Sequence, residues 1–192
     1  MNKIATHDSA TGEKGRGFLS FLVSPFAKTQ SKTIQEQYDA GCRSFDIRIR
    51  KDKDGIYRCA HGLWMSRRSA TKILSEINSF PGPCQVCVTY EGCIENQYDY
   101  SEYQYYCEWC KNAFFNITFG KFCIKYNKKS TIKMSYDVVI YEDKNYSGGI
   151  QGFLSLDGRS WHTYIPIPWL WDRIYKRPHK FNEDKFTFVD FL

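Results

Sequence analysis

The stretch that decides the fold is Gly41-Cys42-Arg43-Ser44-Phe45-Asp46-Ile47-Arg48-Ile49-Arg50. Its second half alternates strictly between apolar and charged residues, which predicts an extended strand. Phe45 and the two isoleucines share one face, which suits burial under a helix. An acid and two guanidinium groups share the other face. Taken alone, that charged face also fits an ordinary solvated side of a sheet.

Two histidine motifs flank this strand. His7-Asp8-Ser9 follows a short extended run at residues 2–6, and His61-Gly62 follows another at residues 56–60. Two histidines, an acid and an arginine are groups that can move protons and stabilise phosphoryl charge. We therefore expect the charged face of the strand to contribute to a site for phosphodiester chemistry.

Helical and extended patterns alternate along much of the chain. We expect helices at 33–40, which opens with a capping box at Thr33 and stops at Gly41, and at 66–78, 98–115 and 168–176. Further strands are expected at 85–90, 120–126, 138–141, 152–155 and 186–191, and a loop with an apolar patch at 9–28. This order predicts an α/β fold around a parallel sheet.

With about eight strands, the candidate architecture is a TIM-type (β/α)8 barrel. We expect a compact, irregular barrel with missing helices in the C-terminal third, formed by residues 1–192 as a single domain. Active sites of such barrels lie at the C-terminal ends of the strands. The polar residues expected at those ends are His7, Asp46, Arg48, His61, Glu91 and Asp190. Closure of the barrel would bring Asp190 beside His7, although a surface acid near a frayed terminus is the alternative.

Composition narrows the class of partner and compartment. The net charge of +6 is scattered, which suits an anionic surface or substrate, and no nucleic-acid-binding signature is present. We see no signal peptide and no membrane-spanning segment, and therefore expect a cytoplasmic or virus-associated protein rather than a classically secreted one. Cys84-x-x-Cys87 and Cys107-x-x-Cys110 have zinc-ribbon spacing, but their strand and helix contexts favour buried reduced thiols.

Three segments together resemble the catalytic X region of phosphatidylinositol-specific phospholipase C, in its bacterial, metal-independent form. They are Thr6-His7-Asp8-Ser9, then Gln30-x-x-x-Ile34-x-x-Gln37-x-x-Ala40-Gly41-Cys42-Arg43-x-Phe45-Asp46-Ile47-Arg48, then His61-Gly62. The match covers residues 4–64, continues more weakly through Glu91 and 120–125, and fades beyond residue 130 apart from 189–191.

The resemblance implies a role for each matched residue. His7 matches the general base that takes a proton from the substrate's 2-hydroxyl, and His61 matches the general acid that protonates the leaving alkoxide. Arg48 matches the arginine that stabilises phosphoryl charge. Asp8 is expected to orient His61, and Asp190 to orient His7. The implied product is a cyclic phosphate together with diacylglycerol.

The same comparison bears on metal and substrate contacts. The calcium-dependent branch carries an acid where Arg48 stands, so we expect a metal-independent enzyme without a cofactor, with Ca²⁺ as the alternative. Glu91 stands where that branch has a ligand, and we expect it to pair with Arg48 near the substrate. Lys125 matches a basic substrate-contacting position, and an ordinary strand lysine is the alternative.

Two further interpretations stay open. One is a metal-dependent glycerophosphodiester-type phosphodiesterase, although its acid pair is replaced here by Asp46-Ile-Arg48. The other is a catalytically idle binding module within a larger assembly such as a virus particle. The expected partners are a phosphoinositide or related phosphodiester and a peripheral membrane surface. An apolar rim of Trp64 and residues 169–171 could touch the lipid, and internal packing is the other explanation for these residues.

Overall fold

The computed structural model describes residues 4–92, 94, 96–124, 146–151 and 186–189. The strands are β1 (Ile4–Thr6), β2 (Cys42–Lys51), β3 (Tyr57–His61), β4 (Trp64–Ser69), β5 (Cys84–Tyr90), β6 (Ile117–Ile124), β7 (Tyr146–Gln151) and β8 (Phe186–Val189). The helices are α1 (Gly17–Ala27), α2 (Ile34–Asp39), α3 (Ala70–Ser79) and α4 (Gln97–Ala113), with a 3₁₀ turn η1 (Ser9–Gly12). The structure confirms the expected α/β class.

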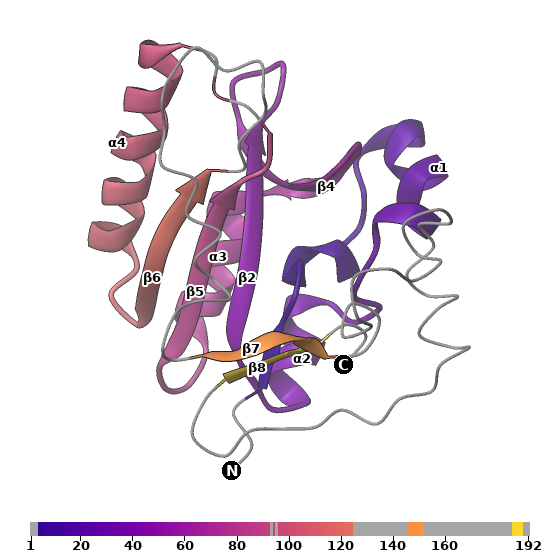
Figure 1. The fold of residues 1–192 in the computed structure, drawn as a ribbon, viewed down its shortest axis with the longest axis vertical. Coiled ribbons are helices and arrows are strands. Elements are labelled where there is room, and N and C mark those ends of the chain that lie inside the picture. Colours follow the sequence, from indigo (N-terminus) through magenta and orange to yellow (C-terminus); the bar gives the residue numbers. More distant parts are fainter. Residues whose placement is uncertain (1–3, 93, 95, 125–145, 152–185, 190–192) are drawn as a thin grey trace.

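Strand β2 is the centre of the sheet (Figure 1). It pairs in parallel with β1 and β5, and β5 continues in parallel to β6. Its last residues pair with β3, which runs antiparallel and returns through a second antiparallel pairing to β4. The sheet is therefore mixed, and the expected all-parallel sheet is wrong, because the turn at Asp54-Gly55 reverses the chain directly into a hairpin.

The last described strand does pair with the first. β8 lies parallel to β1, with Val189 opposite Thr6, and β7 lies on the far side of β8. This confirms the expected pairing of the two ends of the chain. Over the described residues, however, β6 and β7 do not pair, so the sheet is not closed and no barrel is shown. The strands expected at 138–141 and 152–155 and the helix at 168–176 lie outside the described residues.

The core forms on the apolar face of β2. Phe45, Ile47 and Ile49 are fully buried and join one cluster with the inner face of α3. The alternation in the sequence therefore predicted this face correctly. Cysteines fill part of the same interior: in the described part of the chain, six of them are buried free thiols, Cys42, Cys59, Cys84, Cys87, Cys107 and Cys110.

The positions at which the helices begin can be compared with those expected from the sequence. The capping box at Thr33 is present in full, and the chain leaves α2 through Gly41 at φ 99°. The helix expected from Ser66 instead begins after Ser69, whose hydroxyl caps α3, because residues 64–69 complete the hairpin as β4. Helix α1 was expected to be a loop. Apart from Ser20 and Ser24 it is almost entirely apolar, and it contains Pro25, so neither a clear helical periodicity nor an unbroken helical composition marks it.

Helix α1 lies beside β4, on the opposite side of the molecule from α4 (Figure 1). In the portion of the chain that the structure describes, no helix combines the length and the hydropathy needed to cross a membrane.

Candidate active site

The short strand β1 delivers His7 and Asp8 to the charged face of β2. Asp8 adopts the left-handed conformation (φ 44°, ψ 47°) at the start of η1, which is uncommon for a residue with a side chain. Its backbone N–H donates to Asp46 Oδ2 over 3.2 Å. Strain of this kind persists where the surroundings hold it in place, and it is frequent at functional sites. The side chains of His7 and Asp8 are both buried.

Buried polar side chains donate hydrogen bonds to the backbone carbonyls of this turn. The Thr29 hydroxyl and the Gln30 side-chain amide both donate to the His7 carbonyl, over 3.0 and 3.1 Å. Gln37 donates to the Ser9 carbonyl over 2.8 Å. The segment between α1 and α2 therefore fixes the backbone that carries His7. The two glutamines belong to the motif quoted from the sequence, but Thr29 does not.

Arg48 lies at the centre of the site, and its side chain is 15% exposed. Its Nε is 2.5 Å from Asp8 Oδ1 and 3.3 Å from Asp46 Oδ2. Its Nη2 is 2.6 Å from His7 Nε2. A guanidinium can only donate, so this contact is favourable when His7 Nε2 offers its lone pair.

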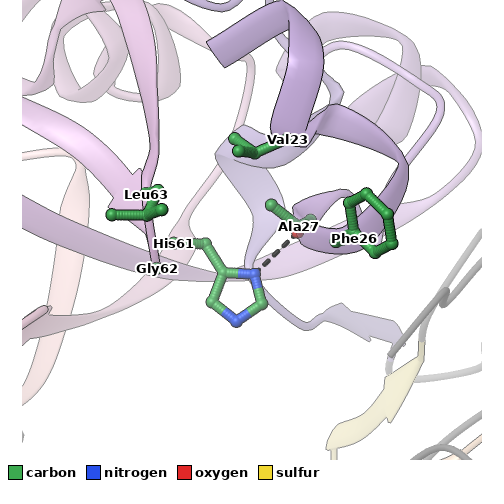
Figure 2. Close-up of a pocket in the computed structure, with 6 residues that line it drawn as sticks. All are labelled: Val23, Phe26, Ala27, His61, Gly62 and Leu63. Atoms are coloured by element: carbon green, nitrogen blue, oxygen red, sulfur yellow. Dashed lines mark hydrogen bonds between the residues drawn. The ribbon is translucent and has the colours of Figure 1, made fainter. Parts of the chain in front are cut away.

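His61, the last residue of β3, approaches the carboxylate of Asp8. Its Nδ1 is 2.6 Å from the Ala27 carbonyl, the last residue of α1 (Figure 2). A carbonyl only accepts, so Nδ1 carries the proton and Nε2 is left for chemistry. His61 Nε2 lies 3.4 Å from Asp8 Oδ2, and His7 Nε2 lies 3.3 Å from the same oxygen. One carboxylate oxygen therefore lies between the two imidazoles.

Sequence reasoning missed the Ala27 carbonyl. It is a backbone group on a segment that was expected to be a loop, and it lies 34 positions from His61. No side-chain pattern signals such a partner.

The site holds more buried acid than base. Asp8, Asp46 and Glu91 are all buried, and they share the single guanidinium of Arg48, with Glu91 Oε2 at 3.8 Å from Nη1. Burial raises the pKa of Asp46, and the nearby charge of Asp8 raises it further, while Arg48 lowers it. The Asp46 carboxyl is therefore easier to protonate than an ordinary aspartate.

The side chains of His7, Asp8 and Asp46 lie close enough together to hold a metal ion, but Arg48 also lies against them. His7, Asp8 and Asp46 each offer a ligand atom, and these atoms lie within 4.8 Å of one another. The guanidinium of Arg48 already contacts all three residues. A divalent cation would have to displace it and then bind against its positive charge.

The structure brings together five of the predicted active-site residues and one predicted substrate contact: His7, Asp8, Asp46, Arg48, His61 and Glu91. The sixth predicted active-site residue, Asp190, follows β8 and lies outside the described residues, as does Lys125. Glu91 pairs with Arg48 as expected, at 3.8 Å, and its Oε1 also accepts the Gly62 N–H over 3.2 Å. Its contact with substrate stays a prediction.

An apolar surface adjoins the site. Phe18, Leu19, Phe21, Leu22 and Phe26 of α1 are exposed, as is Leu63 in the turn between β3 and β4. Trp64, expected at an apolar rim, is fully buried and packs internally, and residues 169–171 lie outside the described residues. The exposed apolar side chains next to His61 are therefore those of α1 and Leu63.

Comparisons with known proteins support the fold. No family model matches the sequence, and no curated protein matches it significantly. Among solved structures, the phosphatidylinositol-specific phospholipase C of Listeria monocytogenes aligns over 99% of this chain and 72% of its own, with TM-score 0.50 and 17% identity.

Two structures of the Staphylococcus aureus enzyme, both of variants, align with TM-scores of 0.43 and 0.45 at 21% and 20% identity. They cover 65% and 70% of this chain, which spans only 46% and 54% of theirs, about half their length. At such identities the likeness extends to the fold alone. This chain has a fold like that of the phosphatidylinositol-specific phospholipases C.

Proposed function

We propose that this protein cleaves phosphatidylinositol, or a related phosphodiester with a neighbouring hydroxyl, by general acid–base catalysis without a metal. The observation that carries the proposal is the pair of imidazole Nε2 atoms at 3.3 and 3.4 Å from one oxygen of Asp8, with Arg48 beside them. The fold shared with the Listeria phospholipase C is consistent with it.

The proposed reaction starts at His7. Its Nε2 takes the proton of the substrate hydroxyl, whose oxygen forms a new bond to phosphorus and closes a cyclic phosphate. The bond between phosphorus and the leaving oxygen breaks, and His61, which carries protons on both ring nitrogens for this step, gives its Nε2 proton to that oxygen. Asp8 keeps both rings in place, and each positioned acid or base contributes about 10²–10⁴-fold.

Arg48 is proposed to change partners when substrate binds. Its guanidinium is held by Asp8, Asp46 and His7 in the absence of an anion. A phosphodiester oxygen competes for the same donors, and planar guanidinium geometry suits it. Transfer of Arg48 to the phosphoryl group releases the lone pair of His7 for the hydroxyl.

The exposed face of α1 supports a lipid substrate. Phe18 and Phe21 stack on each other at the surface, with 6.4 Å between ring centroids. The two residues are 73% and 71% exposed, so burial of their rings in an acyl-chain region is favourable. We propose that this face contacts the membrane that holds the substrate.

The test is the release of cyclic inositol phosphate from phosphatidylinositol vesicles. His7→Ala and His61→Ala should each abolish turnover, whereas His179→Ala, in a segment outside every motif, should retain it. A catalytically idle binding module predicts that the unmodified protein releases nothing. Full activity of either active-site variant rules out the proposed mechanism.

A further inference from the structure

The pocket beside His61 is the feature that the proposed chemistry leaves unexplained (Figure 2). It has a volume of about 340 Å³, at the lower end of the range for small-ligand sites. Val23, Phe26 and Ala27 of α1 line one side, and His61, Gly62 and Leu63 line the other. His61 is the one polar side chain among these residues.

The position of His61 relates the pocket to the reaction. One edge of the ring faces α1, where Nδ1 donates to the Ala27 carbonyl, and the other edge faces Asp8 through Nε2. A leaving oxygen protonated by Nε2 must lie next to this ring. The group attached to that oxygen then lies at the entrance of the pocket.

The walls of the pocket decide what can enter it. A polyol such as an inositol ring would lose its hydrogen bonds to water and find few replacements among the valine, phenylalanine, alanine and leucine side chains. An alkyl or acyl chain gains from the same walls. The head group is therefore expected on the Arg48 side of His61, and the apolar part of the substrate on the α1 side.

The two sides of the pocket are held in place independently of any ligand. The turn is fixed through Gly62, whose N–H donates to Glu91 and whose carbonyl accepts from Arg50 over 2.9 Å. Helix α1 is tied to β4 by the Ser20 hydroxyl, which donates to the Met65 carbonyl over 3.1 Å. A preformed pocket costs little ordering entropy on binding.

We infer that the pocket lined by Val23, Phe26 and Leu63 is a subsite for the first methylenes of an apolar leaving alcohol. This inference rests on the proposed function and deepens it. The protein then selects its substrate by the leaving group as well as by the head group, and it does so for single molecules in solution as well as at a membrane.

The test uses soluble inositol phosphodiesters whose leaving alcohols are methanol, butanol and octanol, all kept monomeric. For the unmodified protein, kcat/KM should rise with chain length by about two- to fourfold for each methylene that enters the pocket, and then level off. Leu63→Ser and Val23→Thr should each flatten that rise with chain length. Phe115→Ser removes an equally apolar, 82% exposed side chain next to α4 and should keep the full rise.

The outcomes separate the two proposals. Cleavage of all three esters at one rate, or an equal slope in the Leu63→Ser and Phe115→Ser variants, overturns the leaving-group subsite and leaves the proposed function standing. Failure of the unmodified protein to cleave any of the esters, or phosphatidylinositol itself, overturns the proposed function. A slope that is lost in Leu63→Ser and in Val23→Thr but kept in Phe115→Ser supports the subsite.

Discussion

Replacing Arg48 with methionine removes the one guanidinium that the three buried acids of the site share. The side chains of Asp8, Asp46 and Glu91 are at most 3% exposed, and their nearest contacts to Arg48 span 2.5 to 3.8 Å. At an effective dielectric constant of about 20, each such pair attracts by about 4–7 kcal/mol. Part of this is offset because the guanidinium no longer has to be desolvated.

The net loss of unfolding free energy for Arg48→Met should be about 3–5 kcal/mol, as for other buried charges that lose a partner. Its pH dependence follows from Asp46, whose pKa burial already places above its ordinary value of 3.8. Arg48 lowers that pKa, so the variant raises it further. An acid with a raised pKa in the folded protein loses stability as the pH rises through that range. The deficit should therefore be smallest near pH 4 and grow toward pH 7.

Urea denaturation at several pH values measures this effect, with Arg67→Met as the matched control. Arg67 is exposed, so its replacement should change the free energy of unfolding by no more than about 0.5 kcal/mol at any pH. A variant Arg48→Met as stable as the unmodified protein, or one with a deficit independent of pH, would refute this account of the site.

Three further predictions follow from the same groups. Asp46→Asn should raise the free energy of unfolding at pH 7 by roughly 1 kcal/mol while lowering turnover, because an amide in that buried place needs no ionisation. The gain should vanish below pH 3.8, and thermal melts at pH 7 and below pH 3.8 check it. Phosphodiesterase activity should be unchanged by EDTA or added Ca²⁺, and loss in EDTA would favour the metal-dependent alternative. Burial raises the pKa of Cys42 and Cys107 to about 12 and that of Cys110 to about 11. Iodoacetamide at pH 8 should therefore label these three cysteines only after denaturation. Rapid labelling of the native protein, detected by mass spectrometry, would contradict this.

Local patterns in the sequence predicted the elements that depend on neighbours in the chain. The alternation in β2 separated a core face from a charged face, and the capping box at Thr33 placed the start of α2. Both signals are short-range, so they survive in any tertiary setting. Helix α1 shows the reverse case: its mostly apolar composition and Pro25 gave no clear helical signal, and its contact with β4 appears only in the tertiary structure.

The candidate site divides in the same way. The sequence by itself determined which residue types are available, namely two histidines, their neighbouring acids and an arginine on the charged face of one strand. Tertiary structure decided how they share charge: Asp8 lies between both imidazoles, and Arg48 lies among three acids that sit on different strands and turns. It also decided that the sheet over the described residues is mixed and open, and that Ala27 holds His61. These features depend on distances between segments far apart in the chain, and residue order specifies such distances only through the packing of the whole fold.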